Sequence, residues 1–365
     1  MNWHRFHRLG LAVAAVLIVS ACGSTSTAGS TDWSKQTSAS AGGGMSSLVA
    51  AAKAEGKLTV IALPPDWANY GAIISGFEAK YGIKITSLNP NGSSQDEVNA
   101  FDGTSRAPDV VDVGQSVALA NTAKFAPYQV ATWGDIPAGA KESTGLWFND
   151  YGGYMGIGYD SSKVPAITSV QDLLGTAFKS KVALSGDPTK SNQGLNGVIM
   201  ASVANGGSLD DVTKGVDFFH QLKQKGNYVP VVGTAATVKS GQTPVLFEWD
   251  YLSASHGKDV STWKIFVPSN AIIGGYYSQA INKAAPHPAA ARLWEEYLYS
   301  NEGQNLWLKG GARPVRQAAM TAAGSVDATA AAALPSVAGA PQIPTADQAT
   351  AAFAYLNSHW SAAIA

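Results

Sequence analysis

The sequence predicts an α/β protein with two lobes, a hinge and a cleft between the lobes. Apolar residues alternate between the period of a strand and the period of a helix, as at residues 57–63 and then 70–81. Residues 146–159 break this alternation, because they are too rich in glycine for a helix and too aromatic for a solvated loop. We interpret this stretch and residues 263–267 as crossings between the lobes, since two crossings between two α/β units create a hinge.

The first lobe is predicted to begin with three strands separated by helices. Strands are expected at residues 57–63, 83–88 and 108–113, with helices at 70–81 and 94–101 between them. The first helix follows from apolar residues at the spacing of one helix face, and Gly82 ends it. An alternation of strands and helices predicts a parallel sheet with right-handed crossovers.

The second lobe repeats the alternation after Pro165. Helices are expected at residues 170–174, 194–204 and 212–222, and strands at 182–184, 229–232 and 245–247. A strand at 272–281 then returns to the first lobe, followed by helices at 290–298 and 301–308. An alanine-rich run at 318–340 shows no clear secondary-structure pattern. Apolar residues between Ala352 and Trp360 predict a last helix that packs back on the body.

The N-terminal residues predict an export signal. A basic head is followed by an apolar core, residues 9–19, that is too short to span a membrane. The core ends in Val-Ser-Ala-Cys, which resembles a bacterial lipobox and implies a lipid on Cys22. We therefore expect an exported protein that is anchored to the outer face of the cell membrane or lies in the periplasm. The predicted parts are a signal peptide (1–22), a flexible tether (23–44), lobe 1 (45–147 plus 268–316), lobe 2 (148–267) and a C-terminal extension (317–365).

Composition excludes several classes of protein. The chain has 365 residues, of which 45% are hydrophobic and 14% charged, so it can bury a large core. A formal net charge of -1 and the lack of a basic stripe argue against nucleic-acid binding. Cys22 is the only cysteine, so no internal disulfide can form. We expect a monomer that needs no cofactor.

The candidate ligand site is organised around residues 243–251. A wholly apolar strand, 245–247, is followed at once by Glu248, Trp249, Asp250 and Tyr251. Ligands of open α/β sheets bind outside the carboxyl ends of the strands. Acids and aromatics recur in the other segments expected at the cleft: Asp66, Trp67 and Tyr70; Asp150 and Tyr151; Tyr276 and Tyr277. This mixture suits a primary ammonium group on a carbon chain, which prefers carboxylates and aromatic faces.

An anion is the alternative ligand. Ser93 and Thr189, with Ser191 beside it, stand just before predicted helices, and helix N-termini with hydroxyl groups bind oxyanions. Plain helix capping accounts for the same residues. A zwitterion such as 2-aminoethylphosphonate would use the hydroxyls and the acids together.

The chain resembles the extracellular solute-binding proteins of ABC importers, in the branch that holds ferric-iron, thiamine, polyamine and aminoethylphosphonate binders. The motifs that carry the resemblance are the lipobox, AKAEGKLTVIA (52–62), GYMGIGYDSSKVP (153–165), KSKVALSGDPTKS (179–191) and the helix pair within 281–316. The resemblance implies a two-lobed, type II periplasmic-binding-protein-like fold that closes on a small ligand. It also implies delivery of that ligand to the membrane subunits of an ABC permease.

Two further functions fit the sequence less well. Iron binders of this family use two adjacent tyrosines where this chain has only Tyr251, and neighbours on a strand such as Tyr276 and Tyr277 point to opposite faces. A secreted hydrolase could use Glu248 and Asp250 as paired carboxylates. However, the chain has no G-x-S-x-G, H-E-x-x-H or G-x-x-x-x-G-K motif, so we expect no enzyme activity.

Overall fold

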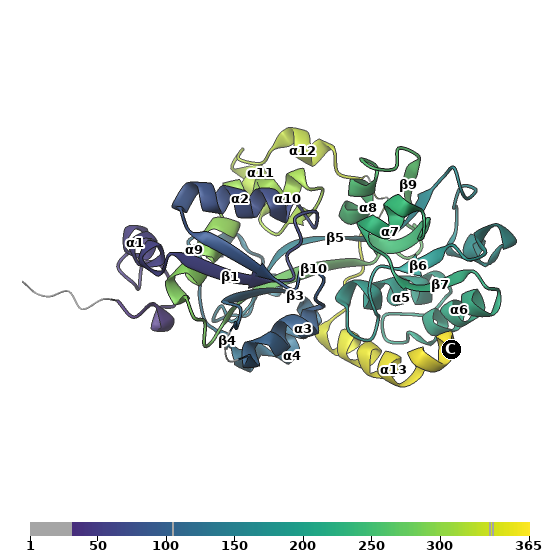
Figure 1. Cartoon of the computed structure of the whole chain (residues 1–365), viewed down its shortest axis with the longest axis horizontal. Helices are drawn as coiled ribbons and strands as arrows, with labels where there is room; N and C mark the ends of the chain where they lie inside the picture. The colour runs from purple at the N-terminus through teal and green to yellow at the C-terminus, as the bar shows by residue number, and fades with distance from the viewer. Residues whose placement is uncertain (1–30, 104–105, 336, 338) are drawn as a thin grey trace, which may run out of the picture. The chain divides into compact units, whose positions relative to one another are not determined.

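The long strand β5 (Phe148–Asp160) links two groups of strands in the computed structural model, which describes residues 31–103, 106–335, 337 and 339–365. Residues 32–365 form one compact unit. The first part of β5 pairs antiparallel with β10 (Gly274–Asn282), and the second part pairs antiparallel with β8 (Val245–Trp249) and β9 (Trp263–Phe266). Figure 1 shows β5 and β10 between the two groups of elements. The predicted crossing at residues 146–159 is therefore confirmed.

Glycines in β5 and β10 allow large side chains to pack directly on the crossing strands. A Cβ on Gly153 would lie 2.6 Å from the Tyr251 ring, and one on Gly275 would lie 2.5 Å from the Trp249 ring. Contacts this short require a residue without a side chain. The glycines thus place the two aromatics of the segment after β8 against the hinge.

Lobe 1 contains two parallel strands, β1 (Lys57–Ile61) and β2 (Lys84–Leu88). The expected third parallel partner, β3 (Val110–Gly114), instead pairs antiparallel with β10. Its link to β1 goes through Asp109, whose backbone N–H donates to the carbonyl of Thr59 and whose carboxylate accepts from the Thr59 N–H at 2.7 Å. The Asp109 carboxylate thus takes the place of a backbone hydrogen bond between β1 and β3. In lobe 1 the predicted parallel pairing is therefore correct for β1 and β2 only.

In the described residues, α-helices complete lobe 1. They are α1 (Met45–Glu55), α2 (Tyr70–Tyr81), α3 (Ser94–Asn99), α4 (Gln115–Ala120), α9 (Pro288–Leu298) and α10 (Asn301–Lys309). Helix α2 has the predicted bounds, buries Tyr70, Ile73 and Phe77, and is ended by Gly82 in the left-handed conformation.

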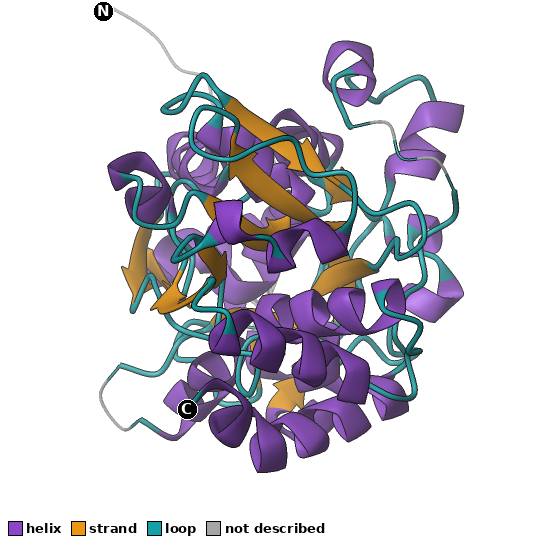
Figure 2. Ribbon diagram, turned by 90° about the vertical axis from the view of Figure 1, so that its right-hand side faces the viewer, coloured by secondary structure: helices purple, strands orange, loops and turns teal. Residues whose placement is uncertain are grey.

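Lobe 2 is built on three parallel strands, with β6 (Val182–Leu184) between β8 and β7 (Tyr228–Val232). All of β8 is buried, as its continuous apolar run predicts. The helices of this lobe are α5 (Asn192–Ala204), α6 (Thr213–Gln224), α7 (Ala235–Ser240) and α8 (Asp250–His256). Helix α8 begins directly after β8, so the segment from Glu248 to Tyr251 does not stay extended. Figure 2 shows helices packed outside the strands.

The C-terminal extension returns to the body. The remaining elements are the short strands β4 (Phe125–Ala126) and β11 (Arg313–Pro314), and the helices α11 (Gln317–Ala322), α12 (Ala328–Ala332) and α13 (Ala346–Ile364). Helix α13 confirms the predicted last helix, and Trp360 packs on Phe219 of α6 with ring centroids 5.3 Å apart. Among the described residues, no helix is long and apolar enough to cross a membrane.

The structure departs from the predicted tether at residues 32–44. Trp33 is buried, in a short 3-10 helix (Trp33–Lys35), and Arg292 of α9 donates to the carbonyls of Ser34 and Gln36. Low-complexity composition suggested a free chain, but one tryptophan and one buried arginine fix this part of it. The predicted signal peptide and Cys22 lie outside the described residues.

Candidate functional site

A cavity of about 370 Å³ lies between the two lobes, at the carboxyl ends of their parallel strands. From lobe 1 it is lined by the loop after β1, the loop after β2 and Asp112 of β3. From lobe 2 it is lined by the segments that follow β6 and β7 and by Glu248 of β8. This is the position at which α/β proteins bind their ligands.

The cavity brings together part of the predicted site. Five of the predicted residues line it: Asp66, Trp67, Ser93, Glu248 and Tyr277. They come from four separate segments of the chain, as the prediction of a cleft at strand ends requires. Trp67 and Tyr277 meet edge to face, with ring centroids 5.7 Å apart, and form an aromatic corner of the cavity.

The other predicted residues lie outside the cavity lining. Tyr70 and Tyr151 are fully buried beneath it, and Asp150 lies deeper in the same network. Trp249 and Tyr251 are buried against the hinge strands. Tyr276 lines a separate narrow space near α4, and Thr189 lines a surface groove beside α13.

Asp250 takes part in an ion pair away from the cavity. Its Oδ2 accepts from Arg313 Nη1 of β11 at 2.8 Å, and its Oδ1 accepts from the Tyr154 N–H of β5 at 2.9 Å. The carboxylate is fully buried, and burial raises its pKa although the Arg313 charge opposes that shift. Asp250 thus joins the start of α8 to the crossing strands.

Asp112 is the carboxylate that the structure places at the floor of the cavity. Its Oδ2 accepts hydrogen bonds from the hydroxyls of Tyr70 at 2.8 Å and Tyr151 at 2.9 Å, while Oδ1 has no partner among the described residues. The Tyr151 hydroxyl in turn accepts from Trp67 Nε1 at 2.7 Å, so the floor is connected to the aromatic corner. Burial raises the pKa of Asp112 to about 6, against the opposing effect of the two phenols.

Two further acids lie next to Asp112, and the pKa of each is raised. Glu97 Oε2 accepts from the Asp112 N–H at 3.1 Å, and Asp150 Oδ2 accepts from Gln279 Nε2 at 2.8 Å. Burial, followed by the charge of Asp112, raises the pKa of both carboxyls well above the usual range. Repulsion from an ionised Asp112 therefore disfavours charge on Glu97 and Asp150.

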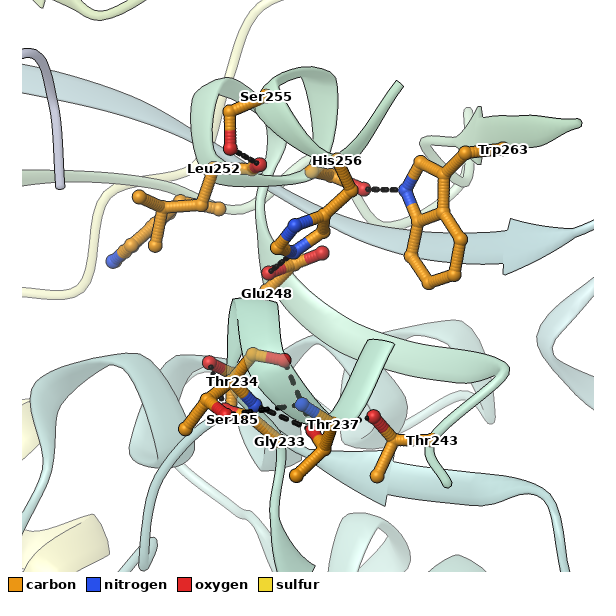
Figure 3. A network of polar contacts seen from close by, with 12 residues as sticks. Ser185, Gly233, Thr234, Thr237, Thr243, Glu248, Leu252, Ser255, His256 and Trp263 are labelled. Carbon is orange, nitrogen blue, oxygen red and sulfur yellow. Dashed lines mark hydrogen bonds and ion pairs between the residues drawn. The ribbon is translucent and has the colours of Figure 1, made fainter. Parts of the chain in front are cut away.

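The lobe 2 wall carries a second carboxylate, paired with a histidine. Glu248 Oε2 lies 3.0 Å from His256 Nε2, and Glu248 Oε1 has no partner among the described residues. Figure 3 shows His256 pointing from α8 toward Glu248, with Trp263 beside it. Burial lowers the pKa of His256, but the hydrogen bond and charge of Glu248, with Asp66, outweigh it and raise the pKa above 6.5.

The hydroxyl groups expected to bind an anion are used in local hydrogen bonds. Ser93 and Ser191 cap α3 and α5, and Thr189 Oγ1 donates to Asp187 Oδ1 at 2.7 Å. On the lobe 2 wall, Thr234 caps α7 and exchanges hydrogen bonds with Thr237, as Figure 3 shows. The capping interpretation therefore describes these residues in the structure.

Acidic side chains dominate the charge of the cavity lining. The carboxyl residues are Asp66, Asp96, Glu97, Asp112, Asp187 and Glu248, and the basic residues are Lys190 and His256. Even with Glu97 neutral, this lining favours a positively charged ligand group, because charges interact more strongly in a cavity than in bulk water. In the described part of the chain, no group of three or more His, Cys, Asp and Glu side chains could hold a metal ion.

Sequence reasoning missed Asp112 and His256. A charged residue in the middle of a strand as apolar as β3 is itself a signal, because a buried carboxylate must have partners or a function. His256 gave no such signal, since its approach to Glu248 depends on α8 starting at Asp250.

Comparisons with known proteins agree with this architecture. A family model described as bacterial extracellular solute-binding protein matches residues 109–336. A comparison with curated protein sequences gives no match. Among solved structures, the periplasmic binding protein AgtB from A. tumefaciens R10 in complex with agropinic acid has 14% identity and a TM-score of 0.66, over 84% of this chain and 98% of AgtB.

Two other solved structures give the same result. The periplasmic binding protein AfuA from Actinobacillus pleuropneumoniae, with fructose-6-phosphate bound, has 16% identity and a TM-score of 0.63, over 84% of this chain and 99% of AfuA. The ferric binding protein from Campylobacter jejuni has 17% identity and a TM-score of 0.63, over 84% of this chain and 99% of its own. The predicted two-lobed, type II periplasmic-binding-protein fold is confirmed.

Proposed function

Because the chain belongs to the bacterial extracellular solute-binding proteins, we propose that it captures a small amine-bearing, polyamine-like solute for an ABC importer. The ligand enters the cavity between the lobes, and closure about the hinge strands surrounds it with residues of both lobes. The protein delivers its ligand, chemically unchanged, to the permease. A lipid on Cys22 holds it at the outer face of the membrane.

The observation that carries this proposal is the carboxylate of Asp112. It lies at the cavity floor, is buried, and keeps one oxygen without a partner among the described residues. Burial of such an oxygen costs free energy, and an ammonium group would relieve that cost by donating a hydrogen bond and supplying the opposite charge. The acidic lining around it supports the same sign of ligand charge.

The aromatic corner supports a ligand with a carbon chain. The polar atom of Trp67 is already bound to Tyr151, so the indole presents its ring to the cavity and not a hydrogen-bond donor. A cation beside an indole face gains cation–π attraction, and methylene groups gain apolar contact. An alkyl amine offers both.

A zwitterion such as 2-aminoethylphosphonate is the second candidate. Lys190 is exposed in the cavity lining on lobe 2 and could pair with an anionic group while Asp112 takes the ammonium. The bound molecules named for AgtB and AfuA are an acid and a sugar phosphate, which is consistent with oxyanion binding on this fold. Carboxyl residues outnumber basic residues around the cavity of this chain, so we rank the amine first.

Thermal unfolding with a ligand panel tests the proposal. The full-length protein in detergent is heated with putrescine, spermidine, 2-aminoethylphosphonate, phosphate, thiamine or ferric citrate. A ligand at a hundredfold excess over its Kd adds about 2.7 kcal/mol of stability, which raises Tm by several degrees for a chain of this size.

The outcomes separate the candidates. Stabilisation by putrescine or spermidine, with no stabilisation by phosphate or ferric citrate, supports the proposed function. Stabilisation by 2-aminoethylphosphonate alone favours the zwitterion, and stabilisation by phosphate or ferric citrate alone contradicts an amine ligand.

A further inference from the structure

His256 occupies a position in which its protonation can respond to the ligand. The imidazole lines the cavity, and its Nε2 faces Glu248 Oε2 at 3.0 Å. The other ring nitrogen, Nδ1, has no hydrogen-bond partner among the described residues, and the side chain as a whole is 7% exposed. Figure 3 shows the ring between α8 and the strand end that carries Glu248.

The two protonation states of His256 offer opposite chemistry at Nδ1. In neutral imidazole Nε2–H donates to Glu248 and Nδ1 carries a lone pair, which accepts a hydrogen bond from an ammonium group. In the imidazolium both nitrogens are donors, so Nδ1–H binds an oxyanion and repels a cation. The proton on Nδ1 therefore decides which sign of ligand the lobe 2 wall accepts.

We propose that His256 exchanges its proton for the ammonium group of the ligand, so that capture of an amine releases a proton from the cavity wall. This inference rests on the proposed amine-binding function. Before binding, the imidazolium neutralises Glu248 and limits the cost of the buried carboxylate. On binding, the proton leaves Nδ1 to solvent, neutral His256 keeps its hydrogen bond to Glu248, and the ammonium takes over the neutralising charge.

The charged groups around His256 favour this exchange. Glu248 of β8 is in direct contact, and Asp66 faces it from lobe 1. Asp259 is nearby, but Lys239 of α7 pairs with it at 2.7 Å. From β9 comes Trp263, which is uncharged and meets the ring edge to face at 5.3 Å.

The other carboxyl and basic lining residues of the cavity are Asp187 and Lys190 of lobe 2 and Asp96, Glu97 and Asp112 of lobe 1. The histidine is thus held protonated mainly by two carboxylates, Glu248 and Asp66, and these are the groups that an arriving ammonium would also neutralise. The ligand and the proton compete for the same negative charge.

The linkage has a definite sign. The raised pKa means that free His256 carries a proton over part of the range from pH 6.5 to 8. A bound cation lowers that pKa, so binding releases protons and the association constant for the amine rises with pH, by up to about tenfold per pH unit. An anionic ligand would raise the pKa, take up protons and show the opposite slope.

Isothermal titration calorimetry of the full-length protein with putrescine, at several values between pH 6.5 and 8, tests the inference. Amines of this kind titrate near pH 10, so the slope over this range reports the protein. The wild type is expected to bind more tightly as pH rises, whereas His256→Gln is expected to show no slope above pH 7, where Asp112, with a pKa of about 6, is ionised in the free protein. His287→Gln is the matched control, because His287 also contacts a buried carboxylate, Asp109 at 2.9 Å, but lies outside the cavity lining.

Glu248→Gln provides a second measurement if His256→Gln does not fold. Without Glu248 the pKa of His256 falls, so the slope should move below pH 6.5. A slope above pH 7 that survives in both variants, or that is lost in His287→Gln, overturns the role of His256 while leaving amine binding intact. If putrescine does not bind the wild type, the proposed function fails, and this inference with it.

Discussion

In the described part of the chain, each wall of the cavity carries a buried carboxylate with an unpartnered oxygen, and the surroundings of the two carboxylates treat their charge in different ways. Asp112 of lobe 1 and Glu248 of lobe 2 both keep one oxygen without a partner among the described residues. The partners of Asp112 are neutral phenols, which stabilise the charge but do not cancel it. The partner of Glu248 is an imidazole that can carry a proton. Lobe 1 therefore supplies net charge to the cavity, and lobe 2 supplies a charge that can change.

Asp112→Asn should have the largest effect on binding, because it removes the charge that no protein group cancels. The amide keeps the shape and can still accept from Tyr70 or Tyr151, so the fold should persist. Loss of one partner of a buried charge pair weakens binding by about 2–5 kcal/mol, and we expect about 3 kcal/mol for putrescine. Calorimetry at pH 7.5 measures the change.

Asp96→Asn is the matched control for this prediction. Asp96 also lines the cavity, but its carboxylate accepts from the N–H and hydroxyl of Ser93 in the capping box of α3. If Asp96→Asn weakens putrescine binding as much as Asp112→Asn does, the cavity acts through its total charge and Asp112 has no special role.

Asp250→Asn should act on stability and leave binding almost unchanged. The substitution leaves Arg313, whose side chain is only 13% exposed, without its carboxylate partner. Breaking a fully buried pair costs about 3–5 kcal/mol, and partial exposure of Arg313 reduces the expected loss to about 2 kcal/mol. Chemical denaturation measures this loss, and calorimetry with putrescine measures affinity. A large fall in affinity at unchanged stability would return Asp250 to the binding site.

The contrast between Glu248 and Asp250 also shows how far the sequence could predict the site. The cavity lies at the end of the buried apolar strand that is followed by two acids and two aromatics, and Glu248 lines it. An extended backbone would have turned Asp250 to the same side. Helix α8 starts at Asp250 instead, and the partner that fixes its carboxylate is 63 residues away in the chain. Such a long-range pair cannot be derived from local pattern.

More of the fold than of the site could be predicted, because the spacing of apolar residues shows which face of a helix or strand is buried. Helix α2 and the crossing strand β5 follow directly from the spacing of apolar residues and from glycine content. The antiparallel pairing of β3 with β10 joins segments more than 150 residues apart, and it depends on Asp109 replacing a rung between β1 and β3. A carboxylate in so apolar a strand was a signal in the sequence, but the place of Asp112 at the cavity floor follows from that pairing and could not be seen before the sheet was known.

The smallest predicted effect concerns Tyr70 and Tyr151, the uncharged partners that distinguish Asp112 from Glu248. Asp112 has a pKa of about 6, raised from 3.8, so below pH 6 it is protonated in the free protein. A bound ammonium favours the ionised form, so putrescine affinity should fall as pH drops below 6, by up to about tenfold per unit. In the unliganded protein the sign is opposite. The stabilisation that the raised pKa contributes is fully present below pH 3.8 and is lost as pH rises through 6.

Tyr151→Phe and Tyr70→Phe should each move this pH dependence upward, because each removes one hydrogen bond to the ionised form of Asp112. One such bond is worth about 1 kcal/mol, so the midpoint should rise by less than one pH unit. Only Tyr151→Phe also removes the acceptor of Trp67 Nε1, so it should weaken putrescine binding at pH 7.5 more than Tyr70→Phe does. Calorimetry from pH 5 to 7.5 distinguishes the two. Equal affinities of the two variants at pH 7.5 would mean that the aromatic corner does not depend on the cavity floor. If the midpoint of the pH dependence moves in neither variant, the phenols do not control the charge of Asp112.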